Sequence, residues 1–311
     1  MTASYYGRPV VKPHQWTPLI PWYFWVGGMA GAASVQCVAA RARGEHRLAV
    51  VEKRAALAGS LIAPVLLIAD LGVPGRFHMM FRVFKPTSPM SVGSWVLSAF
   101  GGTVVASTVA EFLGWERASR ALEIVAAALG PVVTVYTAVL LSDTATPVWH
   151  EAYPTLPFVF VTSGVGAAGA VGSAFAPAEE SGFARLLMLA GAFGLPVAGR
   201  IMETQLGHFI GEPYSKGKGG SFRRVSGALS LAGGAIGLLG GRNRTANRVA
   251  AACVAAAGVF ERFAVSAAGK QSAQDPKYVV QPQRERLEAR ERLSRRIDDR
   301  DVADEAARTG S

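Results

Sequence analysis

The sequence predicts an all-α polytopic membrane protein, built as a bundle of eight transmembrane helices. Half of its 311 residues are apolar and 17% are charged, whereas a soluble protein averages about 25% charged residues. Apolar runs recur along the chain, and each is about long enough to cross a bilayer. The 35 glycines point the same way, because Gly is more frequent in membrane helices than in soluble ones.

The apolar runs give the expected order of elements, which we divide into two four-helix halves. A transmembrane domain over 19–267 is expected between a polar segment 1–18 and a charged tail 268–311. From Arg284 to Arg300 the tail alternates charges of both signs around a few apolar residues, a pattern shared by solvated helices and disordered tails. The eight runs cover residues 19–40, 55–71, 92–114, 121–142, 155–176, 183–206, 225–241 and 248–267.

An even number of spans places both ends of the chain on one side of the membrane, here called side A. The loops expected on side A are long and rich in polar, aromatic and Pro residues. Those expected on the opposite side, side B, are short. Side A receives 1–18, 72–91, 143–154, 207–224 and the tail, and side B receives 41–54, 115–120, 177–182 and 242–247.

Charge and cysteine content argue against several classes of function. The net charge is +10, but the basic residues lie in short loops between apolar runs, as topology anchors do, so no nucleic-acid partner is expected. The two cysteines, Cys37 and Cys253, are too few for an iron–sulfur cluster, which needs about four thiolates. The five histidines lie in loops or at helix ends, so neither axial ligands for a haem nor a metal site is expected.

Ionisable residues inside membrane spans are costly and mark candidate functional sites. Most of those in the apolar runs lie at the side-A ends of the even-numbered helices. This clustering predicts a polar pocket beneath side A, although helix ends are also where charged groups reach water most easily. Glu111 is at the side-B end of the third helix, either as an interfacial residue or as the far end of a proton path. The side-A set contains Asp70, Tyr136, Asp143, Arg200, Glu203, Glu261 and Arg262.

The loop 72–91 contains apolar side chains whose exposure to water is energetically unfavourable. Its cationic and titratable residues alternate with Phe77, Phe81 and Phe84, as in an amphipathic segment at a membrane surface. The loop is also far longer than a helix–helix connection requires. It is therefore either a surface segment on the membrane or a docking surface for a partner, in which case Arg82, Lys85 and Pro86 are the expected contacts.

Motifs in and around this loop resemble the NrfD/PsrC family, the polysulfide-reductase-type membrane subunit. The resemblance covers about residues 5 to 285. It is strongest over Asp70-Leu71-Gly72, Pro74, Arg76-Phe77, Phe84-Lys85-Pro86, Ser88-Pro89-Met90-Ser91, Gly93 and Trp95. Supporting matches are Trp16-Thr17, Val26-Gly27-Gly28, Gly31, Tyr136-Thr137, Leu140-Leu141-Ser142, Pro147, Trp149, Arg262, Gly269, Ser272, Asp275 and Pro276.

The resemblance implies a multi-pass subunit of the cell (inner) membrane, without metal centres, that serves electron transport in anaerobic respiration. Such subunits accompany a four-cluster ferredoxin-type iron–sulfur subunit and a molybdopterin-type catalytic subunit, and bind menaquinone or ubiquinone beneath the iron–sulfur partner. Asp70, Arg76 and Tyr136 match family positions near the quinone. On the first helix Pro21-Trp22-Tyr23 stands where the family has polar residues, which puts a direct quinone contact from that helix in doubt.

The sequence therefore predicts a subunit, not catalytic by itself, that passes electrons between a partner's iron–sulfur cluster and membrane quinone. A purely structural anchor and a small-solute transporter stay as alternatives. A transporter would carry a binding site near the bilayer midplane, where these helices have few ionisable residues. We expect quinone contacts from Asp70, Arg76, His78 and Tyr136, and a proton relay through Asp143, Glu203, Glu261, Arg262 and Glu111.

Overall fold

The computed structural model describes residues 10–241, 243–288 and 290–292, and no strand occurs among them. Within these residues, eight helices are at least 20 residues long, three are short, and residues 277–288 form a further helical segment. The long helices are α1 (Leu19–Ala42), α2 (His46–Ala69), α3 (Pro89–Phe112), α4 (Glu116–Ser142), α6 (Leu156–Phe175), α7 (Gly182–Ile210), α9 (Gly217–Leu239) and α10 (Arg244–Gln274). The short ones are η1 (Pro74–Phe81), α5 (Pro147–Glu151) and α8 (Glu212–Ser215).

Several of the long helices are suited to cross a membrane, so the chain is a multi-pass membrane protein. Five of them, α3, α4, α6, α7 and α10, are long and apolar enough to span. A sixth candidate pairs α2 with η1, which are bent by 112° relative to each other. The all-α prediction is confirmed over the described residues, while the prediction of eight spans stays a prediction.

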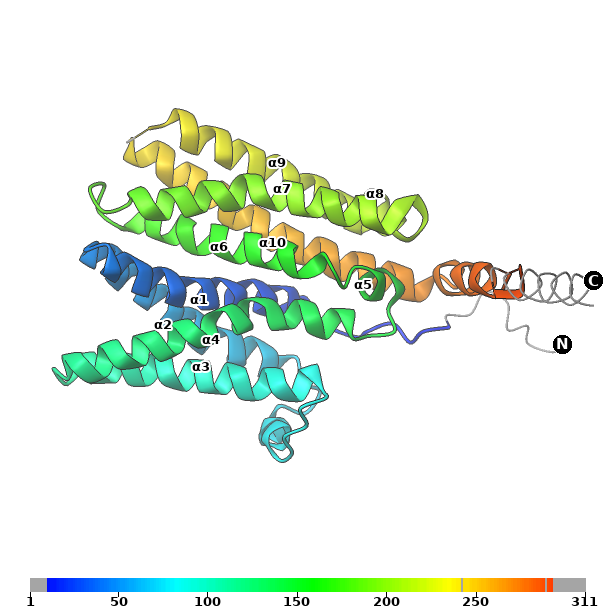
Figure 1. The fold of residues 1–311 in the computed structure, drawn as a ribbon, viewed down its shortest axis with the longest axis horizontal. Coiled ribbons are helices and arrows are strands. Elements are labelled where there is room, and N and C mark those ends of the chain that lie inside the picture. The colour runs from blue at the N-terminus through cyan, green and yellow to red at the C-terminus, as the bar shows by residue number, and fades with distance from the viewer. Residues whose placement is uncertain (1–9, 242, 289, 293–311) are drawn as a thin grey trace, which may run out of the picture.

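The long helices fall into two groups of four (Figure 1). One group holds α1 to α4, and the other holds α6, α7, α9 and α10. Helix α1 lies at the junction, because it packs against α2 and α4 in its own group and against α6 and α10 in the other. A helix placed this way must be buried on several sides, and 16 of its 24 residues are buried.

The two ends of the bundle differ in their connections. The first described residues, η1, α5, α8 and the end of α10 lie at one end, which is side A (Figure 1). The turns on side B are short, and three of them contain a glycine with a positive φ, Gly44 (79°), Gly114 (75°) and Gly241 (54°). A left-handed residue just past a helix C-terminus closes the last turn with little strain only when it lacks a Cβ, so these glycines allow tight reversals.

The helix boundaries depart from the apolar runs at two places that matter for function. Helix α2 begins at His46 rather than at 55, and α9 begins at Gly217 rather than at 225. Charged residues expected in loops, Lys53 and Arg223 among them, therefore lie inside the bundle, where both are buried. Apolar runs cannot reveal such helix segments, because the charges that interrupt the runs are neutralised by partners on other helices.

Helices α1 and α4 cross at two glycines that leave no space for a side chain. A Cβ added at Gly31 would lie 2.4 Å from the carbonyl oxygen of Gly130, and one at Gly130 would lie 2.4 Å from the carbonyl oxygen of Gly31. Because these contacts are with backbone atoms, a side chain at either position would push the two helices apart. Close contacts between small residues of this kind are common in membrane bundles.

We therefore expect Gly31→Ala to destabilise the protein by about 1–3 kcal/mol, the usual cost of overpacking. Gly227→Ala is the matched control, because a Cβ at Gly227 in α9 meets nothing within 4 Å. Thermal unfolding of the detergent-solubilised chain measures both. Equal stability of the two variants would show that the α1–α4 crossing tolerates a larger separation.

Candidate functional site

A cavity of about 750 Å³ lies at the side-A end of the first helix group. It is bounded by the starts of α1 and α3, by the ends of α2 and α4, by η1, and by the chain segment that precedes α1. It brings together two of the predicted quinone contacts, Asp70 and Tyr136. Most of its wall is apolar or aromatic, and the residues used below are His14, Trp16, Tyr23, Asp70, Met80 and Tyr136.

Tyr136 is positioned by a close contact with α3. A Cβ added at Gly93 would lie 2.5 Å from Cε2 of the tyrosine ring, so this glycine makes the space that the ring occupies. The phenolic oxygen is buried and has no hydrogen-bond partner among the described residues. An unpaired buried hydroxyl costs free energy, and its position in the cavity wall suits a ligand that accepts a hydrogen bond.

Asp70 fastens the N-terminal strap, defined here as residues 12–17, over the cavity. Its Oδ1 accepts hydrogen bonds from the backbone N–H of Thr17 (2.9 Å) and from Thr17 Oγ1 (2.5 Å). Residues 12–16 of the strap line the cavity. The carboxylate at the end of α2 thus has a structural role besides any contact with a ligand.

His14 is a strap residue that sequence analysis did not select. Its ring lies 4.7 Å from the ring of Trp16 and 4.8 Å from that of Trp149, centroid to centroid. Burial, and secondly the positive charge of Lys270, lower the pKa of His14 to about 4, so the imidazole is neutral near pH 7. Its Nδ1 is buried without a partner among the described residues, and this atom could serve a ligand in the cavity.

Helix α1 also contributes to the cavity wall, through the segment that departs from the family pattern. Tyr23, Ile20 and Phe24 line the wall, and Tyr23 is 4% exposed. The Pro21-Trp22-Tyr23 segment therefore presents an aromatic hydroxyl-bearing side chain toward the same space as Asp70 and Tyr136. A sequence motif could not reveal this contribution, because it gives residue types at fixed positions and not the direction in which a side chain points.

The other predicted quinone contacts do not line this cavity. Arg76 and His78 are exposed on η1, whereas Met80 of the same element is in the cavity wall. Their predicted contact with a quinone stays a prediction. The docking residues Arg82, Lys85 and Pro86 follow η1 and are exposed.

Asp143 belongs to a second side-A cavity of about 370 Å³, shared with His150, Glu151 and Arg286. Arg286 lies on the helical segment 277–288 that follows α10, and it pairs with Glu151 at 2.6 Å. The segment from Arg284 to Arg300 is thus helical over 284–288 and 290–292, and its remaining residues lie outside the described part of the chain.

An ion-pair cluster anchors the start of this tail to α8. Glu212 accepts hydrogen bonds from Lys277 Nζ (2.7 Å) and from the Tyr278 hydroxyl (2.8 Å). The hydrogen bond from Lys277, with further ones from Lys216 and Tyr278, lowers the pKa of Glu212 to about 2. The same hydrogen bond raises the pKa of Lys277. The tail is therefore held against side A by charge-assisted contacts.

Two predicted proton-relay residues meet through Arg223 in the second helix group. Arg223 contacts Glu203 Oε1 at 2.8 Å and Glu261 Oε2 at 3.1 Å. Glu261 is fully buried, and its Oε1 has no hydrogen-bond partner among the described residues. The guanidinium occupies space left by Gly199 of α7, where a Cβ would overlap its Nη2.

Arg262, the next residue along α10, is also fully buried. Its guanidinium carbon lies 3.5 Å from the centre of the Phe160 ring, and Nη2 donates to the Phe160 carbonyl at 3.1 Å. A cation over an aromatic face is attracted by the ring's quadrupole, more so when desolvated. The two neighbours Glu261 and Arg262 thus serve different contacts on α10.

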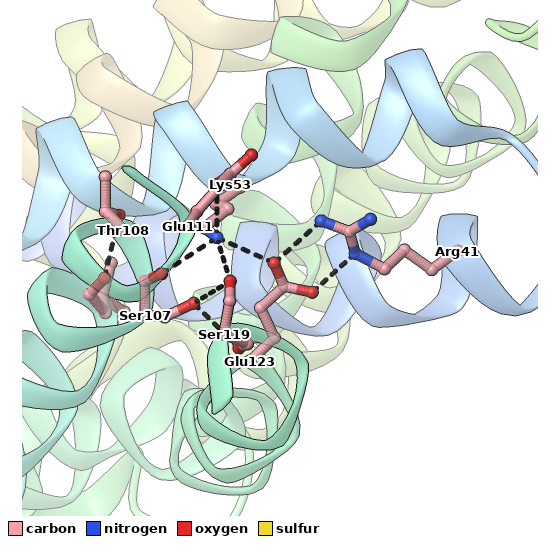
Figure 2. Close-up of polar contacts among 8 residues, drawn as sticks. Arg41, Lys53, Ser107, Thr108, Glu111, Ser119 and Glu123 are labelled. Carbon is pink, nitrogen blue, oxygen red and sulfur yellow. Dashed lines mark hydrogen bonds and ion pairs between the residues drawn. The ribbon is translucent and has the colours of Figure 1, made fainter. Parts of the chain in front are cut away.

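The largest departure from the predicted site is a charged cluster at side B (Figure 2). Lys53 Nζ lies 2.5 Å from Glu111 Oε2 and 2.9 Å from Glu123 Oε1, and it donates to Ser119 Oγ at 2.8 Å. Arg41 binds Glu123 through two N–H groups, with distances of 2.5 and 2.8 Å. Glu111, for which the sequence left an interfacial position and the far end of a proton path open, is therefore one member of a network.

Sequence analysis missed most of this cluster because it assigned 41–54 to a loop. The signal that could have found it is helical spacing, since Lys53 follows Ala49 and precedes Ala56 and Ser60 on the buried face of α2. Glu123 likewise precedes Ala126 and Gly130 on the buried face of α4.

The fold and these polar groups define the chain as a multi-pass helical membrane protein with a cavity at one end and charged residues inside the bundle. A family model described as polysulfide reductase, NrfD_2, matches residues 1–275. The chain therefore belongs to the NrfD-type polysulfide reductase family of membrane subunits, as the sequence motifs predicted. No curated protein matched the sequence.

Proposed function

We propose that this chain is the quinone-interacting membrane anchor of a multi-subunit oxidoreductase in the cell membrane. It passes electrons between a partner iron–sulfur subunit, itself attached to a molybdopterin-type catalytic subunit, and menaquinone or ubiquinone. The single observation that carries the proposal is the side-A cavity, which combines an apolar wall with the unpaired hydroxyl of Tyr136.

The cavity suits a quinone ring in size and chemistry. Ligand sites in proteins are mostly apolar clefts of about 300–1,000 Å³ with a few polar groups that fix orientation. The cavity has about 750 Å³, and the phenol of Tyr136 and the imidazole of His14 each carry a buried polar atom without a protein partner. A bound quinone would supply two-electron redox chemistry, with two carbonyl oxygens that accept hydrogen bonds and protons.

The residues of the chain have distinct roles in this proposal. Tyr136 would donate a hydrogen bond to a carbonyl oxygen of the quinone, and the neutral imidazole of His14 would offer a second polar contact. Asp70 holds the strap through Thr17 and so keeps water from the cavity. Arg223 holds Glu203 and Glu261 in one network, and a part of these carboxylates, Asp143 and Arg262 in proton transfer stays a prediction.

The loop 72–91 is the proposed docking surface for the iron–sulfur subunit. Its apolar residues Phe77, Met79, Val83 and Phe84 are between 42% and 64% exposed. Phe81 and Phe84 pack edge-on against Trp95, at 5.6 and 6.2 Å between ring centroids, and this contact ties the loop to α3. An apolar centre with a polar rim is the usual anatomy of an interface. The loop also lies beside the cavity in which the proposed quinone would receive the electrons.

Tyr136→Phe is the test of the quinone site. It removes the hydrogen-bond donor and keeps the ring that packs on Gly93, so we expect quinone reduction by the purified complex to fall about tenfold or more. Tyr153→Phe is the matched control, because Tyr153 is 65% exposed and does not line the cavity. Full activity of Tyr136→Phe together with full activity of Asp70→Asn would rule out this site.

Two further experiments distinguish the proposed function from its alternatives, a structural anchor and a small-solute transporter. A structural anchor would bind the partner yet hold no quinone, so extraction of the purified complex would yield none. A transporter would take up a solute when the chain alone is placed in liposomes. Neither alternative accounts for the aromatic cavity with its unpaired phenol.

A further inference from the structure

We propose that the charged cluster at side B is a proton entry site, and that it leads through the first helix group toward the side-A cavity. The inference rests on the proposed quinone function, because reduction of one quinone to quinol consumes two electrons from the partner and two protons. It assigns those protons to the side of the membrane opposite the cavity.

The members of the cluster drawn in Figure 2 differ in their exposure to solvent. The Glu111 side chain is 40% exposed, Lys53 is 6% exposed and Glu123 is 5% exposed. Outside lies a cavity of about 230 Å³ lined by Lys53, Arg54, Thr108 and Glu111. Water in that cavity can reach the Glu111 carboxylate, whereas Glu123 is reached through Lys53.

Lys53 also borders a second, inner cavity. This one has a volume of about 20 Å³ and is lined by Ser34, Lys53, Ser107 and Glu123, among apolar residues. A polar cavity needs about 10–15 Å³ to hold one water molecule, so it is large enough for a single water that bridges the cluster to Ser34. The ammonium group thus separates an outer from an inner polar space.

A proton can cross this point without any net change in the groups. A proton from water binds Glu111, Lys53 gives one of its protons to Glu123, and Lys53 takes the proton from Glu111 in return. The lysine ends as it began, and the proton has moved from the exposed carboxylate to the buried one. The two contacts of Nζ, at 2.5 and 2.9 Å, are short enough for this exchange.

Buried hydroxyl groups continue from Glu123 toward the cavity. Glu123 and Tyr136 are both on α4, about 20 Å apart at 1.5 Å per residue. Ser34 donates to the carbonyl of Gly31, and Thr134 donates to the carbonyl of Gly130, so both hydroxyls lie at the α1–α4 crossing between the two ends. Each offers an oxygen that can accept and release a proton together with intervening water.

The charges around the cluster balance, which explains how it survives inside a bundle. Arg41 and Lys53 are cationic, and Glu111 and Glu123 are anionic, so the four sum to zero. Glu52, the neighbour of Lys53, faces α6 instead, where its Oε1 lies 2.3 Å from the position of a Cβ on Gly172. An added proton gives this neutral cluster a net charge of +1, which favours passing the proton on, as a relay requires.

The test uses the purified complex in liposomes of known orientation, with a pH-sensitive dye in the lumen. A reduced viologen supplies electrons and a water-soluble naphthoquinone accepts them. Lys53→Met removes the relay, and Lys53→Arg keeps the charge but holds its proton at all accessible pH values. Arg47→Met is the control, because Arg47 is an exposed residue near the side-B end of α2.

We expect the wild-type complex and Arg47→Met to take up protons from the side-B compartment. Both Lys53 variants should lose that uptake and reduce naphthoquinone at least about tenfold more slowly, while their binding of the naphthoquinone, measured by titration without a reductant, is unchanged. Side-A uptake by the wild type, or side-B uptake that persists in Lys53→Arg, would overturn the inference and leave the quinone site intact. A wild-type complex that reduces no quinone would instead overturn the proposed function.

Discussion

Replacing Arg223 by methionine is expected to lower the free energy of unfolding by about 3–5 kcal/mol, the usual cost of breaking a buried ion pair from one side. The side chain of Arg223 is 10% exposed and that of Glu261 is fully buried. Without the guanidinium, Glu261 keeps a carboxylate in the bundle with neither water nor that partner. Glu203, which is 27% exposed, can reach solvent and should contribute less.

Two further variants make this prediction specific. Arg224→Met is the matched control, because Arg224 is exposed and bonds mainly to Ser215. Arg223→Met combined with Glu261→Gln should recover part of the loss, since the second change removes the stranded charge. Chemical unfolding of the chain in mixed micelles measures all of them. If Arg223→Met were as stable as Arg224→Met, the network would contribute no net stability.

Reversing two charges on the docking loop is expected to release the partner subunits from the membrane. Arg82→Glu with Lys85→Glu replaces two cations by two anions on an exposed surface. Like charges brought together across an interface cost several kcal/mol, enough to shift binding by more than a hundredfold. The chain itself should remain inserted, because neither side chain is buried in the bundle.

The measurement is the amount of iron–sulfur partner in washed membranes relative to this chain. Lys218→Glu with Arg224→Glu reverses the same number of charges on α9 at the same end of the bundle, and both residues are exposed. We expect this control to retain the partner. Equal release by the two double variants would indicate a general electrostatic effect of side A rather than docking by the loop 72–91.

The sequence alone determined the class of the fold, the family and two residues of the candidate site. Apolar runs identified the helices because a bilayer demands long apolar segments whatever their neighbours are. The motifs around Asp70 and Tyr136 identified the family, and these two residues indeed share one cavity. Arg76 and His78 came from the same stretch of sequence, yet the bend of 112° between α2 and η1 carries them to the surface.

Only the tertiary structure decided which charged residues are inside the protein. Lys53 and Arg223 interrupt apolar patterns, so composition assigns them to loops, but in the bundle they meet carboxylates from other helices. Their burial is favourable only when those partners are in place, and Glu123, the buried partner of Lys53, is 70 residues away along the chain. The residues next to Lys53 or Arg223 in the sequence do not show which distant carboxylate will pair with them. The side-B cluster and the Arg223 network could therefore be recognised only in the packed bundle.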